Sequence, residues 1–421
     1  MVRRESAKLL FVGSIPTRTF SFFDLEAWGE APATAMHLSR LALSLGQSAT
    51  LKLNELANNL KAEGKPVVHL GGGEPEEKIP GGAFSESKKL LDGGFVRYTP
   101  VSGTAPLKKE IAAYTERHYG VKPGPKNIVV ASGAKQAIYN FLISVVDPGD
   151  QVIFPAPYWV SYPEMVRLAY GTPVIVRPRA GELLVSAEDI ESHLTSSTKA
   201  ILLNSPNNPS GQVYPEGFIR ELVEICEGRN IYLLMDDIYN RLVFDGLKAP
   251  SAYDFSKRPL NESVIVSING VSKSFSMTGF RIGWSVANEA LTQAMVKVQA
   301  QVSSCPSALS QAAAAGALRE GDGFSDTLCA GLEKKRDMMV AELSKLKKVK
   351  LHKPQGTFYS FPDFSAYEQD STKLSALLLE KALVVTVPGV EFGLEGHLRL
   401  SYCGSEQDII EGVARIRKIL D

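Results

Sequence analysis

The sequence has few of the features that mark secreted, membrane-spanning or nucleic-acid-binding proteins. It contains 4 cysteines in 421 residues, and none of them forms a Cys-x-x-Cys pair, so it indicates neither a disulfide framework nor a cysteine zinc site. Lys plus Arg and Asp plus Glu both number 46, so the formal net charge is 0, whereas a nucleic-acid-binding protein usually has a basic excess. No apolar run approaches the roughly 20 residues of a transmembrane helix. The closest histidines, His37 and His69, are too far apart for one helical metal motif. The composition favours a cytoplasmic protein and does not point to a metal ion, a membrane or a nucleic acid as partner.

Residues 1–35 differ in character from the rest of the chain. Their apolar run at positions 9–12 is too short for a secretory signal, and acidic residues at positions 24, 26 and 30 are unusual in a mitochondrial transit peptide. We interpret this stretch as an extension outside the folded core. A start codon assigned upstream of Met36 and a targeting segment are the two explanations that the sequence leaves open.

From residue 48 onward, apolar β-branched runs alternate with amphipathic stretches such as Lys135–Val145 and Pro215–Glu227. Such alternation predicts an α/β fold, with a mostly parallel sheet covered by helices on both faces. The runs are continuously apolar, which is typical of strands buried on both sides. The predicted strands are Ile128–Ala131, Gln151–Phe154, Ala200–Leu203, Ile231–Met235, Val264–Ile268 and Ile282–Ala287.

The pattern changes near residue 322. A long charged helix is predicted over Gly323–Leu346, short strands over Val349–His352 and Thr357–Phe361, and a final helix over Ser405–Leu420. This order indicates a smaller α+β domain. We expect four parts: the extension (1–35), an N-terminal arm that also contributes to the small domain (36–80), a large domain (81–321) and the small domain (322–421).

Small and polar residues follow several predicted strands, at the edge where parallel sheets bind ligands. Ser132–Lys135 forms a small-residue turn that opens a helix, which suits an anion but also occurs for steric reasons alone. Asn204–Gly211 places amides between prolines, which either holds a hydrogen-bond donor rigidly or merely ends the strand. Asp236 and Asp237 follow a buried strand and point to opposite faces. One of them can therefore face a ligand while the other caps the next helix.

The stretch 269–284 has the strongest chemical signal. Lys273 lies between small residues in the loop after the strand Val264–Ile268. Such a lysine is accessible, and it suits Schiff-base chemistry when desolvation or nearby cations lower its pKa. Arg281 follows in the same stretch and offers a planar guanidinium to a phosphate.

These motifs together resemble those of the class I pyridoxal-phosphate aminotransferases. Gly270–Gly283 resembles the lysine signature of that family, and the other strand-end motifs occur in the family's order, ending with Arg399 in His-Leu-Arg-Leu-Ser-Tyr. Within the family, Tyr158–Met165 is most similar to the bacterial aspartate aminotransferases. The resemblance extends from about residue 36 to the C-terminus. It implies the fold of the fold-type-I pyridoxal-phosphate transferases, with a large and a small domain.

The resemblance implies that pyridoxal 5′-phosphate is the cofactor and that Lys273 holds it covalently, then moves the substrate proton. The family pattern Asp-x-x-Tyr selects Asp236 as the partner of the pyridine nitrogen, which keeps the ring an electron acceptor. By the same resemblance, Tyr239 and Asn208 would contact the ring hydroxyl, and Trp159 would stack on the ring.

The cofactor phosphate would contact Arg281, the amides of Ala134 and Lys135, and Tyr98 from a second subunit. That last role implies a homodimer with shared active sites. Gly270 stands where some relatives have a phosphate-binding serine, so this contact would be absent.

Arg399 and Gly73 resemble the residues that bind the substrate α-carboxylate, with Asn208 and Trp159 beside them. An arginine suits this task because its planar fork matches two carboxylate oxygens.

Lys135, Ser48 and Thr50 resemble the set that recognises an acidic side chain in one bacterial subgroup, although Lys135 could also be a solvated lysine at a helix start. We therefore expect ping-pong transamination between aspartate and 2-oxoglutarate. Aromatic amino acids, alanine or prephenate are alternative substrates, and a lyase or synthase reaction on the same fold is an alternative chemistry. A cofactor-sensing transcription regulator is disfavoured, because residues 1–35 are too short and too weakly charged for a DNA-binding domain.

Overall fold

The computed structural model describes residues 38–46 and 49–421, and the chain divides into two compact units, Met1–Leu45 and Gly46–Asp421. In the first unit the described residues form helix α1 (Arg40–Ser44), in which the Ser39 side chain accepts a hydrogen bond from the amide of Ala42. The predicted extension, residues 1–35, lies outside the described residues. The second unit contains the other described helices and strands.

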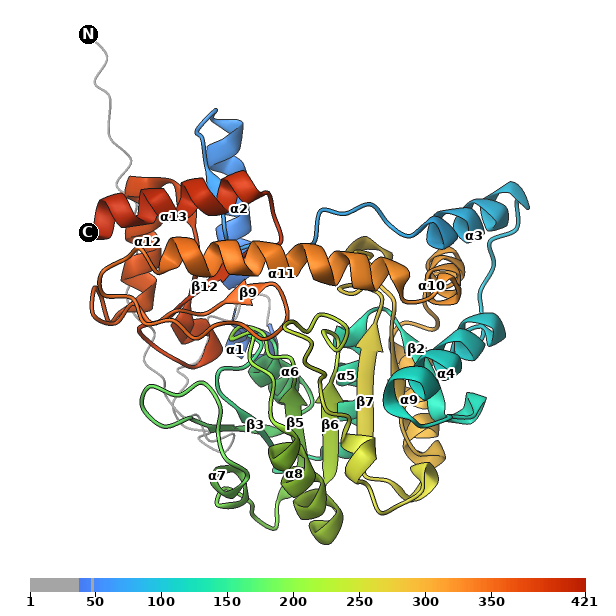
Figure 1. Ribbon diagram of the computed structural model, residues 1–421. Helices are drawn as coiled ribbons and strands as arrows, with labels where there is room; N and C mark the ends of the chain where they lie inside the picture. The colour runs from blue at the N-terminus through green and yellow to red at the C-terminus, as the bar shows by residue number, and fades with distance from the viewer. Residues whose placement is uncertain (1–37, 47–48) are drawn as a thin grey trace, which may run out of the picture. The chain divides into compact units, whose positions relative to one another are not determined.

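A seven-stranded sheet forms the centre of the second unit, in the order β2-β8-β7-β6-β5-β3-β4 (Figure 1). Strand β8 runs antiparallel to both of its neighbours, β2 and β7, whereas the other adjacent pairs of this sheet are parallel. The mostly parallel sheet predicted from the sequence is therefore confirmed. The strands are β2 (Ile128–Ala131), β3 (Gln151–Pro155), β4 (Thr172–Val176), β5 (Thr198–Asn204), β6 (Tyr232–Asp236), β7 (Ile265–Gly270) and β8 (Gly283–Val286).

Helices cover both faces of this sheet. Successive strand residues point to opposite faces: in β5, Ala200 and Leu202 belong to one hydrophobic cluster, while Ile201 and Leu203 belong to the other. This explains why the strands are continuously apolar. One face is covered by α5 (Ala134–Val145), α6 (Tyr162–Leu168) and α9 (Glu289–Val302), and the other by α4 (Ala105–Tyr119), α7 (Ala187–Glu191), α8 (Glu216–Arg229) and α10 (Ala308–Glu320).

Strand β4 is not predicted by the sequence. Pro173 interrupts its apolar run, and a proline argues against a central strand because it cannot donate a backbone hydrogen bond. In the structure β4 is the last strand of the sheet and pairs with β3. A proline is tolerated there because one side of an edge strand needs no hydrogen bonds.

The C-terminal part of the chain builds its own hydrophobic cluster around two small sheets. Strand β1 (Val68–His69), from far earlier in the chain, pairs in parallel with β10 (Val384–Val385). The other sheet has the order β11-β12-β9. Its strands are β9 (Tyr359–Ser360), β11 (Val387–Pro388) and β12 (Leu398–Ser401), and the remaining helices of the unit are α2 (Ala49–Ala62), α3 (Gly81–Asp92), α11 (Gly323–Leu343), α12 (Ser371–Ala382) and α13 (Glu406–Leu420).

The predicted strand at Val349–His352 is wrong. Only Lys350 pairs there, in a single antiparallel bridge with Asp363. Pro354 follows the run and Pro362 precedes its partner, and the fixed φ and missing N–H of proline oppose a longer ladder. The predicted strand at 357–361 is shortened to β9, because Thr357 has a φ of 66°, outside the extended region, and Pro362 follows at the other end.

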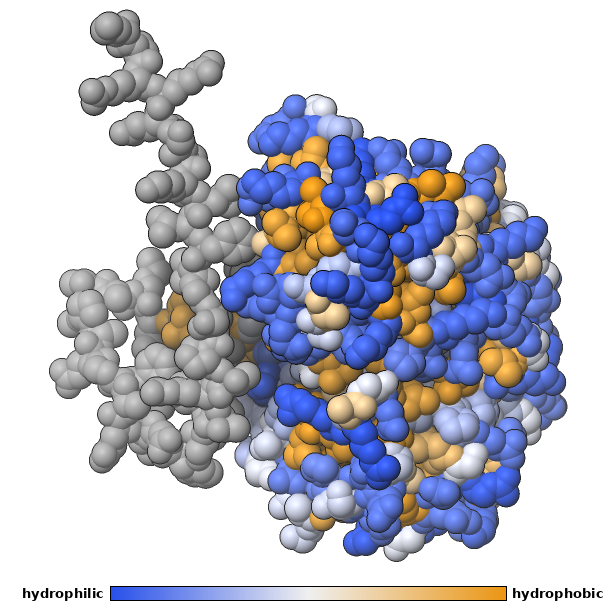
Figure 2. Space-filling model, turned by 60° about the vertical axis from the view of Figure 1, so that its left-hand side comes forward, coloured by the Kyte–Doolittle hydropathy of each residue, from blue (hydrophilic) through white to orange (hydrophobic). Residues whose placement is uncertain are grey.

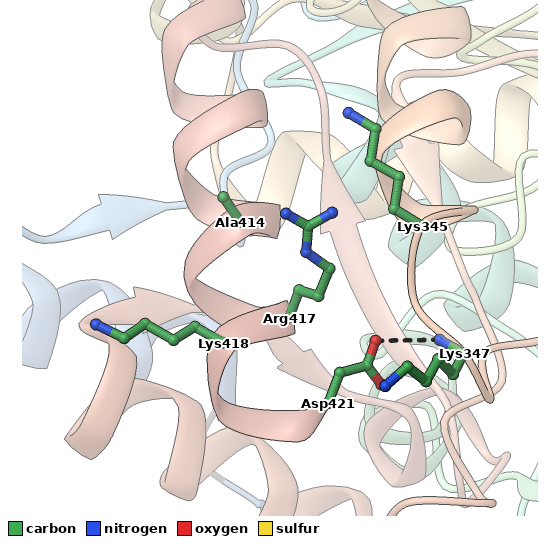
Figure 3. Close-up of a pocket in the computed structure, with 6 residues that line it drawn as sticks. All are labelled: Lys345, Lys347, Ala414, Arg417, Lys418 and Asp421. Atoms are coloured by element: carbon green, nitrogen blue, oxygen red, sulfur yellow. Dashed lines mark hydrogen bonds between the residues drawn. The ribbon is translucent and has the colours of Figure 1, made fainter.

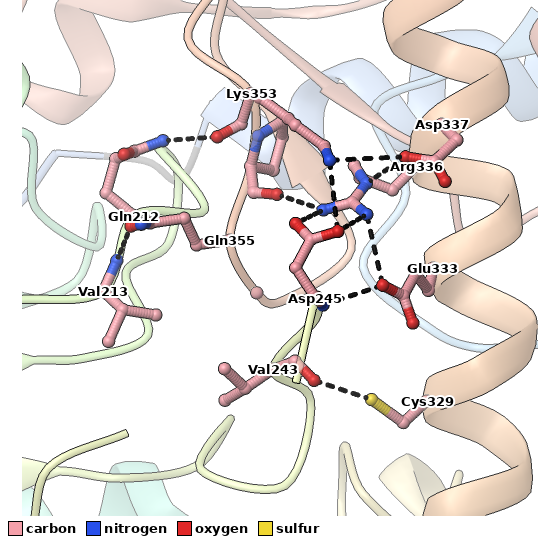
Figure 4. Close-up of polar contacts among 12 residues, drawn as sticks. Gln212, Val213, Val243, Asp245, Cys329, Glu333, Arg336, Asp337, Lys353 and Gln355 are labelled. Carbon is pink, nitrogen blue, oxygen red and sulfur yellow. Dashed lines mark hydrogen bonds and ion pairs between the residues drawn. The ribbon is translucent and has the colours of Figure 1, made fainter. Parts of the chain in front are cut away.

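A buried arginine fixes α11 to two loops of the second unit (Figure 4). The Arg336 side chain is fully buried, and its Nη1 and Nη2 atoms each donate to a carboxylate oxygen of Asp245 at 2.9 Å. Nη1 also donates to the carbonyl of Pro354 at 2.8 Å. In addition, the amide of Phe244 donates to the carbonyl of Gln355 at 2.8 Å. The loop that leads into β9 is therefore held both by α11 and by the segment that follows β6.

The surface of the described chain is of mixed polarity. On the face in Figure 2, hydrophilic residues surround scattered hydrophobic patches. Among the residues that the structure describes, no helix is both long and apolar enough to cross a membrane. The four cysteines are free thiols.

Candidate active site

The candidate site lies at the carboxyl edge of the seven-stranded sheet, where the loops after β2, β3, β5, β6 and β7 meet. Because β8 runs in the opposite direction, its first residue lies at this same edge, where Gly283 pairs with both Ala131 and Gly270. Ligands bind at this edge in open parallel sheets. Strands β9 and β12 and the glycines after β1 contribute residues from the smaller sheets.

Asp236, the last residue of β6, has a buried carboxylate of which one oxygen atom has a hydrogen-bond partner and the other has none among the described residues. Its Oδ2 atom accepts a hydrogen bond from the hydroxyl of Tyr162 at 2.6 Å, while its buried Oδ1 atom has no partner among the described residues. Burial raises the pKa of Asp236 to about 6, although the Tyr162 hydrogen bond and the positive charge of Lys273 act in the opposite direction. An unpaired buried carboxylate oxygen is costly, so Oδ1 is suited to accept a proton-bearing ligand group.

Asp237 faces the opposite side of the sheet, as the strand alternation predicts. It interacts with the hydroxyl of Tyr119, a residue of the cluster under α4, whereas Tyr162 belongs to the cluster under α5 and α6. Of the two adjacent aspartates, Asp236 is therefore the one on the Tyr162 side, with Lys273.

Lys273 follows β7 and is half-buried. Its Nζ atom donates a hydrogen bond to the carbonyl of Gly73 at 2.8 Å and lies 5.7 Å from the ring centroid of Phe358. Burial lowers the pKa of Lys273 to about 8; Cys403 and Glu74 act against this, and the smaller contributions of Arg399 and Arg281 act in the same direction as burial. The amine is therefore partly neutral near physiological pH, which a base or a nucleophile requires.

Three glycines bring the first turn of α5 close to Arg281. A Cβ atom on Gly133 would lie 2.3 Å from Nη2 of Arg281, and one on Gly283 would lie 2.3 Å from the amide nitrogen of Ala134. Gly270 pairs with Gly283 across the ladder, and a Cβ there would lie 2.7 Å from a backbone oxygen. An exposed guanidinium beside the free amides of a helix N-terminus is a suitable anion site.

Lys135 and Trp159 meet beside this anion site. Lys135 is exposed in the first turn of α5, and its Nζ atom lies 4.8 Å from the ring centroid of Trp159. Partial desolvation and the positive charge of Arg281 lower the pKa of Lys135. Trp159 in turn packs edge-on against Tyr162, with ring centroids 5.5 Å apart.

Arg399 on β12 is a buried guanidinium held in one orientation. Nη1 donates to Oδ1 of Asn208 at 3.1 Å and Nη2 to the carbonyl of Gly71 at 3.0 Å. Its Cζ atom lies 4.3 Å from the ring centroid of Tyr359 and 5.1 Å from that of Phe392. The buried Nε atom has no partner among the described residues, so this arginine can still bind an acceptor.

Asn204 links these groups across two strands. Its Nδ2 atom donates to the carbonyl of Asp236 at 2.7 Å, and its Oδ1 atom accepts from the amide of Asn208 at 2.7 Å. The rings of Tyr239 and Tyr359 pack edge-on, with their centroids 6.2 Å apart.

The structure brings most of the predicted site residues into one connected cluster. Tyr98 makes none of the contacts above, and its side chain is 93 % exposed. Ser48 lies outside the described residues, and only the backbone of Thr50 is described, in α2. Among the described residues, no group of three or more His, Cys, Asp or Glu side chains is placed to hold a metal ion. The residues in the cluster are Gly73, Ala134, Lys135, Trp159, Asn208, Asp236, Tyr239, Lys273, Arg281 and Arg399.

Sequence reasoning missed four residues of this cluster. Tyr162 lies within the stretch that resembles bacterial aspartate aminotransferases, three positions after Trp159, so a partner for Asp236 could have been sought there. Asn204 ends its strand, which is a weaker signal. Tyr359 and Phe392 are aromatic residues in apolar surroundings, and nothing in their local sequence separates them from core residues.

A separate hollow of about 540 Å³ lies at the C-terminal end of α13 (Figure 3). Its lining includes four basic side chains, and the amide of Lys347 donates to Asp421 at 3.2 Å. These are surface residues, and they contribute nothing to the cluster at the strand ends.

The family described as aminotransferase class I and II matches residues 65–416 of this chain. A protein of Aquifex aeolicus named as a probable aspartate/prephenate aminotransferase is 38% identical over 383 residues, covering 90% of this chain and 97% of the relative. The aspartate aminotransferase of Rhizobium meliloti is 36% identical over 391 residues, covering 90% of this chain and 95% of that protein. A crystal structure of the aspartate aminotransferase from the same organism superposes with a TM-score of 0.87 at 35% identity, covering 91% of this chain and 98% of that one. The chain therefore belongs to the class I and II aminotransferase family.

Proposed function

We propose that this aminotransferase uses pyridoxal 5′-phosphate to transfer the amino group of aspartate to 2-oxoglutarate, giving oxaloacetate and glutamate in a ping-pong cycle. One observation supports this most strongly. A lysine with a lowered pKa, a carboxylate with an unpaired buried oxygen and a buried arginine meet at one edge of the sheet. The names of the relatives support aspartate as the amino donor.

The residues present fit the cofactor. Oδ1 of Asp236, buried and without a partner among the described residues, is suited to accept a hydrogen bond from a protonated pyridine nitrogen. The backbone at the start of α5 and the exposed guanidinium of Arg281 suit a phosphate. The glycines at 133 and 283 leave no space for a side chain between these groups, so the backbone amides remain accessible. Tyr239 and Trp159 are the proposed contacts of the ring hydroxyl and the ring face.

When bound, pyridoxal phosphate supplies a ring that accepts the electrons of the broken Cα–H bond. Lys273 is the proposed covalent anchor and, once released, the base that accepts the proton at its Nζ atom. A pKa of about 8 leaves a useful fraction of this amine neutral at physiological pH. Positioned acid–base groups of this kind contribute about 10²–10⁴-fold to rate.

Arg399 is the proposed partner of the substrate α-carboxylate, with Gly73 and Asn208 beside it. Its guanidinium is already fixed by two hydrogen bonds and two aromatic rings, so little conformational freedom is lost when a carboxylate binds. The unpaired Nε atom gains a partner in that complex.

Lys135 is the proposed partner of the second carboxylate of aspartate, together with Ser48 and Thr50. Its exposed ammonium lies against Trp159, near the proposed cofactor ring. A cation placed there favours a dicarboxylic substrate over an apolar one.

A homodimer with shared active sites is also part of this proposal. Tyr98, the proposed phosphate ligand of a second subunit, is 93 % exposed, and nearby Phe95 is 71 % exposed. Large exposed aromatic side chains of this kind are typical of protein interfaces. A cytoplasmic location is proposed as well, because the four free cysteines are compatible with a reducing compartment.

We further propose the division into a large domain (81–321) and a small domain (322–421, with part of 36–80). Lys273 and Asp236 belong to the first part, and Arg399 to the second. A site assembled in this way can couple substrate binding to domain movement.

Prephenate is a second candidate acceptor. The relative from Aquifex aeolicus is named for both aspartate and prephenate. A prephenate amino acceptor still requires a carboxylate contact at Arg399, and its second carboxylate suits Lys135.

A panel of amino donors with 2-oxoglutarate, and of acceptors with glutamate, tests the proposal. We expect kcat/KM for aspartate to exceed that for phenylalanine and alanine at least tenfold, since one charged hydrogen bond contributes about 1.5–3 kcal/mol. Prephenate as acceptor is measured in the same panel. Equal rates for all donors would contradict the proposed specificity.

The Lys273→Ala variant tests the chemistry itself. It should lack the absorbance band of lysine-bound cofactor and retain almost no turnover. Lys334→Ala, which removes an exposed lysine of α11, is the matched control and should behave like the unmodified protein. Normal turnover of Lys273→Ala would overturn the assignment.

A further inference from the structure

The segment 98–104, which leads into α4, is exposed at one end and held in place over the rest of its length. Tyr98 is 93 % exposed, and Phe95 before it is 71 % exposed. The residues that follow Tyr98 are hydrogen-bonded to β2, α9 and α10. The position of the Tyr98 phenol therefore depends on the groups that hold the rest of this segment.

Part of the segment covers the free edge of β2. Strand β2 stands at the end of the strand order, beside β8, so the backbone groups on its outer side need other partners. The amide of Val130 donates to the carbonyl of Ser102 at 3.1 Å. Gly103 follows with a φ of 102°, and a Cβ atom there would lie 2.4 Å from Cγ2 of Val130. The glycine therefore allows the segment to lie directly against the strand.

Gln299 of α9 joins the segment to the same strand. Its side chain is fully buried. The Nε2 atom donates to the carbonyl of Val101 at 2.6 Å and to that of Val130 at 2.8 Å. The Oε1 atom accepts from Nδ2 of Asn140 in α5 at 2.9 Å. Gln299 therefore ties the middle of the segment to β2 and α5.

Gln311 of α10 is also fully buried, and it is hydrogen-bonded to both ends of the segment. Its Nε2 atom donates to the hydroxyl of Thr99 at 2.8 Å and to the carbonyl of Pro306 at 2.9 Å, and its Oε1 atom accepts from the amide of Thr104 at 2.8 Å. Thr99 is next to Tyr98 in the chain. Gln311 therefore fixes the segment one residue away from the exposed phenol.

Both glutamines use their side-chain amides fully. Each Nε2 atom donates twice and each Oε1 atom accepts once, and a buried polar network that is fully satisfied favours one arrangement of the chain. An apolar side chain can fill such a space at little cost in stability, but it does not determine where the segment lies. The two amides therefore fix the position of the segment 98–104.

A second route leads from Gln311 to the candidate site of its own chain. Pro306 lies between α9 and α10, and in the same connection the Ser303 hydroxyl accepts a hydrogen bond from Gln136 of α5. Oε1 of Gln136 accepts from the amide of Ser132 at 2.6 Å, in the turn before α5. This route passes through several side chains, whereas Gln311 contacts the exposed segment directly. The contacts therefore favour an effect on that segment over an effect on the chain's own site.

We propose that Gln311, supported by Gln299, is a positioning residue that holds Tyr98 in place for the cofactor phosphate of a second subunit. This inference rests on the proposed function, because it assumes pyridoxal phosphate and a homodimer in which Tyr98 reaches the other site. A phenol that is held in advance loses little freedom when a phosphate binds. A change at Gln311 therefore weakens the site of the other subunit and leaves its own site unchanged.

Four substitutions test this role. Gln311→Met removes three hydrogen bonds but keeps a flexible side chain of similar size. Thr99→Val removes only the hydroxyl that Gln311 contacts, and it takes the place of Gln311→Met if that variant does not fold. Tyr98→Phe gives the full effect of losing the phenol. Gln151→Met is the matched control: Gln151 accepts from Thr195 at 2.8 Å, and as the first residue of β3 it lies at the opposite end of that strand from the site.

The first measurement is the affinity of each homodimer for pyridoxal phosphate, from titration of the absorbance band of lysine-bound cofactor. Tyr98→Phe should weaken binding at least tenfold, the equivalent of one hydrogen bond to a charged group. Gln311→Met should weaken it about fivefold, and Gln151→Met should leave it unchanged. The double variant should be within about twofold of Tyr98→Phe alone, because two residues that act through one contact are not additive. A further fivefold loss in the double variant would contradict the proposal.

Mixed dimers show which of the two sites is affected. Two chains with different affinity tags are combined, and one carries Lys273→Ala, so only the site of the other chain gives the absorbance band. With Gln311→Met on the same chain as Lys273→Ala, the remaining site receives Tyr98 from the altered chain, and its affinity for pyridoxal phosphate should fall about fivefold. With the two substitutions on different chains, the affinity should stay within about twofold of that of the dimer with Lys273→Ala alone.

A loss of affinity only when the two substitutions are on different chains would overturn the proposal, because Gln311 would then act on its own site. Equal losses in both arrangements, or no loss in either, would also overturn it. An effect of Tyr98→Phe without any effect of Gln311→Met would contradict the positioning role and leave the proposed function intact. If the unmodified protein forms no such absorbance band with pyridoxal phosphate, the proposed function itself is wrong.

Discussion

Asp236 should destabilise the cofactor-free protein, and Asp236→Asn should remove that cost. The side chain is 4 % exposed, and burial raises its pKa from 3.8 to about 6. The folded state therefore binds the proton of this carboxyl more tightly than the unfolded state does. Well below pH 3.8 the group is protonated in both states and carries no penalty. As the pH rises from 4 to 6 the unfolded state ionises first, and the folded state loses stability relative to it.

The magnitude follows from the pKa difference. A shift of roughly two units corresponds to about 3 kcal/mol at pH 8, where the penalty is complete. At pH 5 about half of it has developed. Asparagine stays neutral at every pH but leaves its own polar atoms imperfectly paired, which subtracts about 1–2 kcal/mol at all pH values. The difference in the variant's stability advantage between pH 5 and pH 8 therefore tests the pKa shift more directly than its stability at either pH.

The assay is urea unfolding of the cofactor-free protein at pH 5 and pH 8, at one protein concentration. We expect Asp236→Asn to be more stable than the unmodified protein at pH 8, and its advantage to exceed that at pH 5 by about 1.5 kcal/mol. Pyridoxal phosphate should then stabilise the unmodified protein more than the variant, because only aspartate pairs with a protonated ring nitrogen.

Asp245→Asn is a control, because the pKa shift of Asp245 has the opposite sign to that of Asp236. The hydrogen bond from Arg336 lowers the pKa of Asp245 to about 2, so its ionised form stabilises the folded state above about pH 4, and the benefit is lost as the pH falls toward 2. This variant should be less stable than the unmodified protein at pH 8. If the advantage of Asp236→Asn does not grow between pH 5 and pH 8, the reasoning about the buried carboxylate is refuted.

Three further substitutions test other parts of the site and fold. Lys135→Ala should lower kcat/KM for aspartate at least tenfold more than for phenylalanine, since a charged hydrogen bond contributes about 1.5–3 kcal/mol; equal losses in steady-state assays would remove the acidic-pocket argument. Gly283→Ala should weaken pyridoxal phosphate binding at least tenfold and lower the melting temperature, because its Cβ would lie 2.3 Å from the amide nitrogen of Ala134; Gly331→Ala, which has open space in α11, should do neither. Arg336→Met should cost about 2 kcal/mol or more in urea unfolding, and a neutral result would show that the buried ion pair does not hold α11 in place.

Much of the sheet and its functional edge follows from local sequence. The runs that become β2, β3, β5, β6, β7 and β8 are apolar on both faces, and parallel strands bring their carboxyl ends to one edge. For residues that directly follow such strands, such as Lys273 and Asp236, the sequence pattern alone therefore predicts that they lie together. Only the specific resemblance to aminotransferases adds chemical roles to them.

The parts that local sequence does not predict depend on contacts between distant segments. Pro173 disfavours a strand by local rules, but β4 is an edge strand, and one side of an edge strand needs no backbone hydrogen bonds. The segment around Lys350 resembles a strand in the sequence because the neighbours of Lys350 are apolar. In the structure only Lys350 pairs, because the length of a strand depends on the segment with which it pairs. Tyr359 is placed against Arg399 only when β9 pairs with β12. No pattern within either strand indicates that pairing.

The charge distribution of the site explains how one cluster can both bind anions and supply a base. The chain has no net charge, yet Lys135, Lys273, Arg281 and Arg399 gather around one main acid, Asp236. Burial lowers the pKa values of both lysines, that of Lys273 to about 8, and the neighbouring arginines act in the same direction, although Cys403 and Glu74 oppose them at Lys273. Bound phosphate and carboxylate groups relieve the repulsion, so they stabilise the site, but they also raise the pKa of the lysine again. Burial is the larger contribution and persists when anions bind, because substrate also excludes water. Lys273 can therefore remain a usable base in the complex only because it is desolvated. A lysine enclosed by the backbone of Gly73 and the ring of Phe358 is for this reason a better base than an exposed lysine.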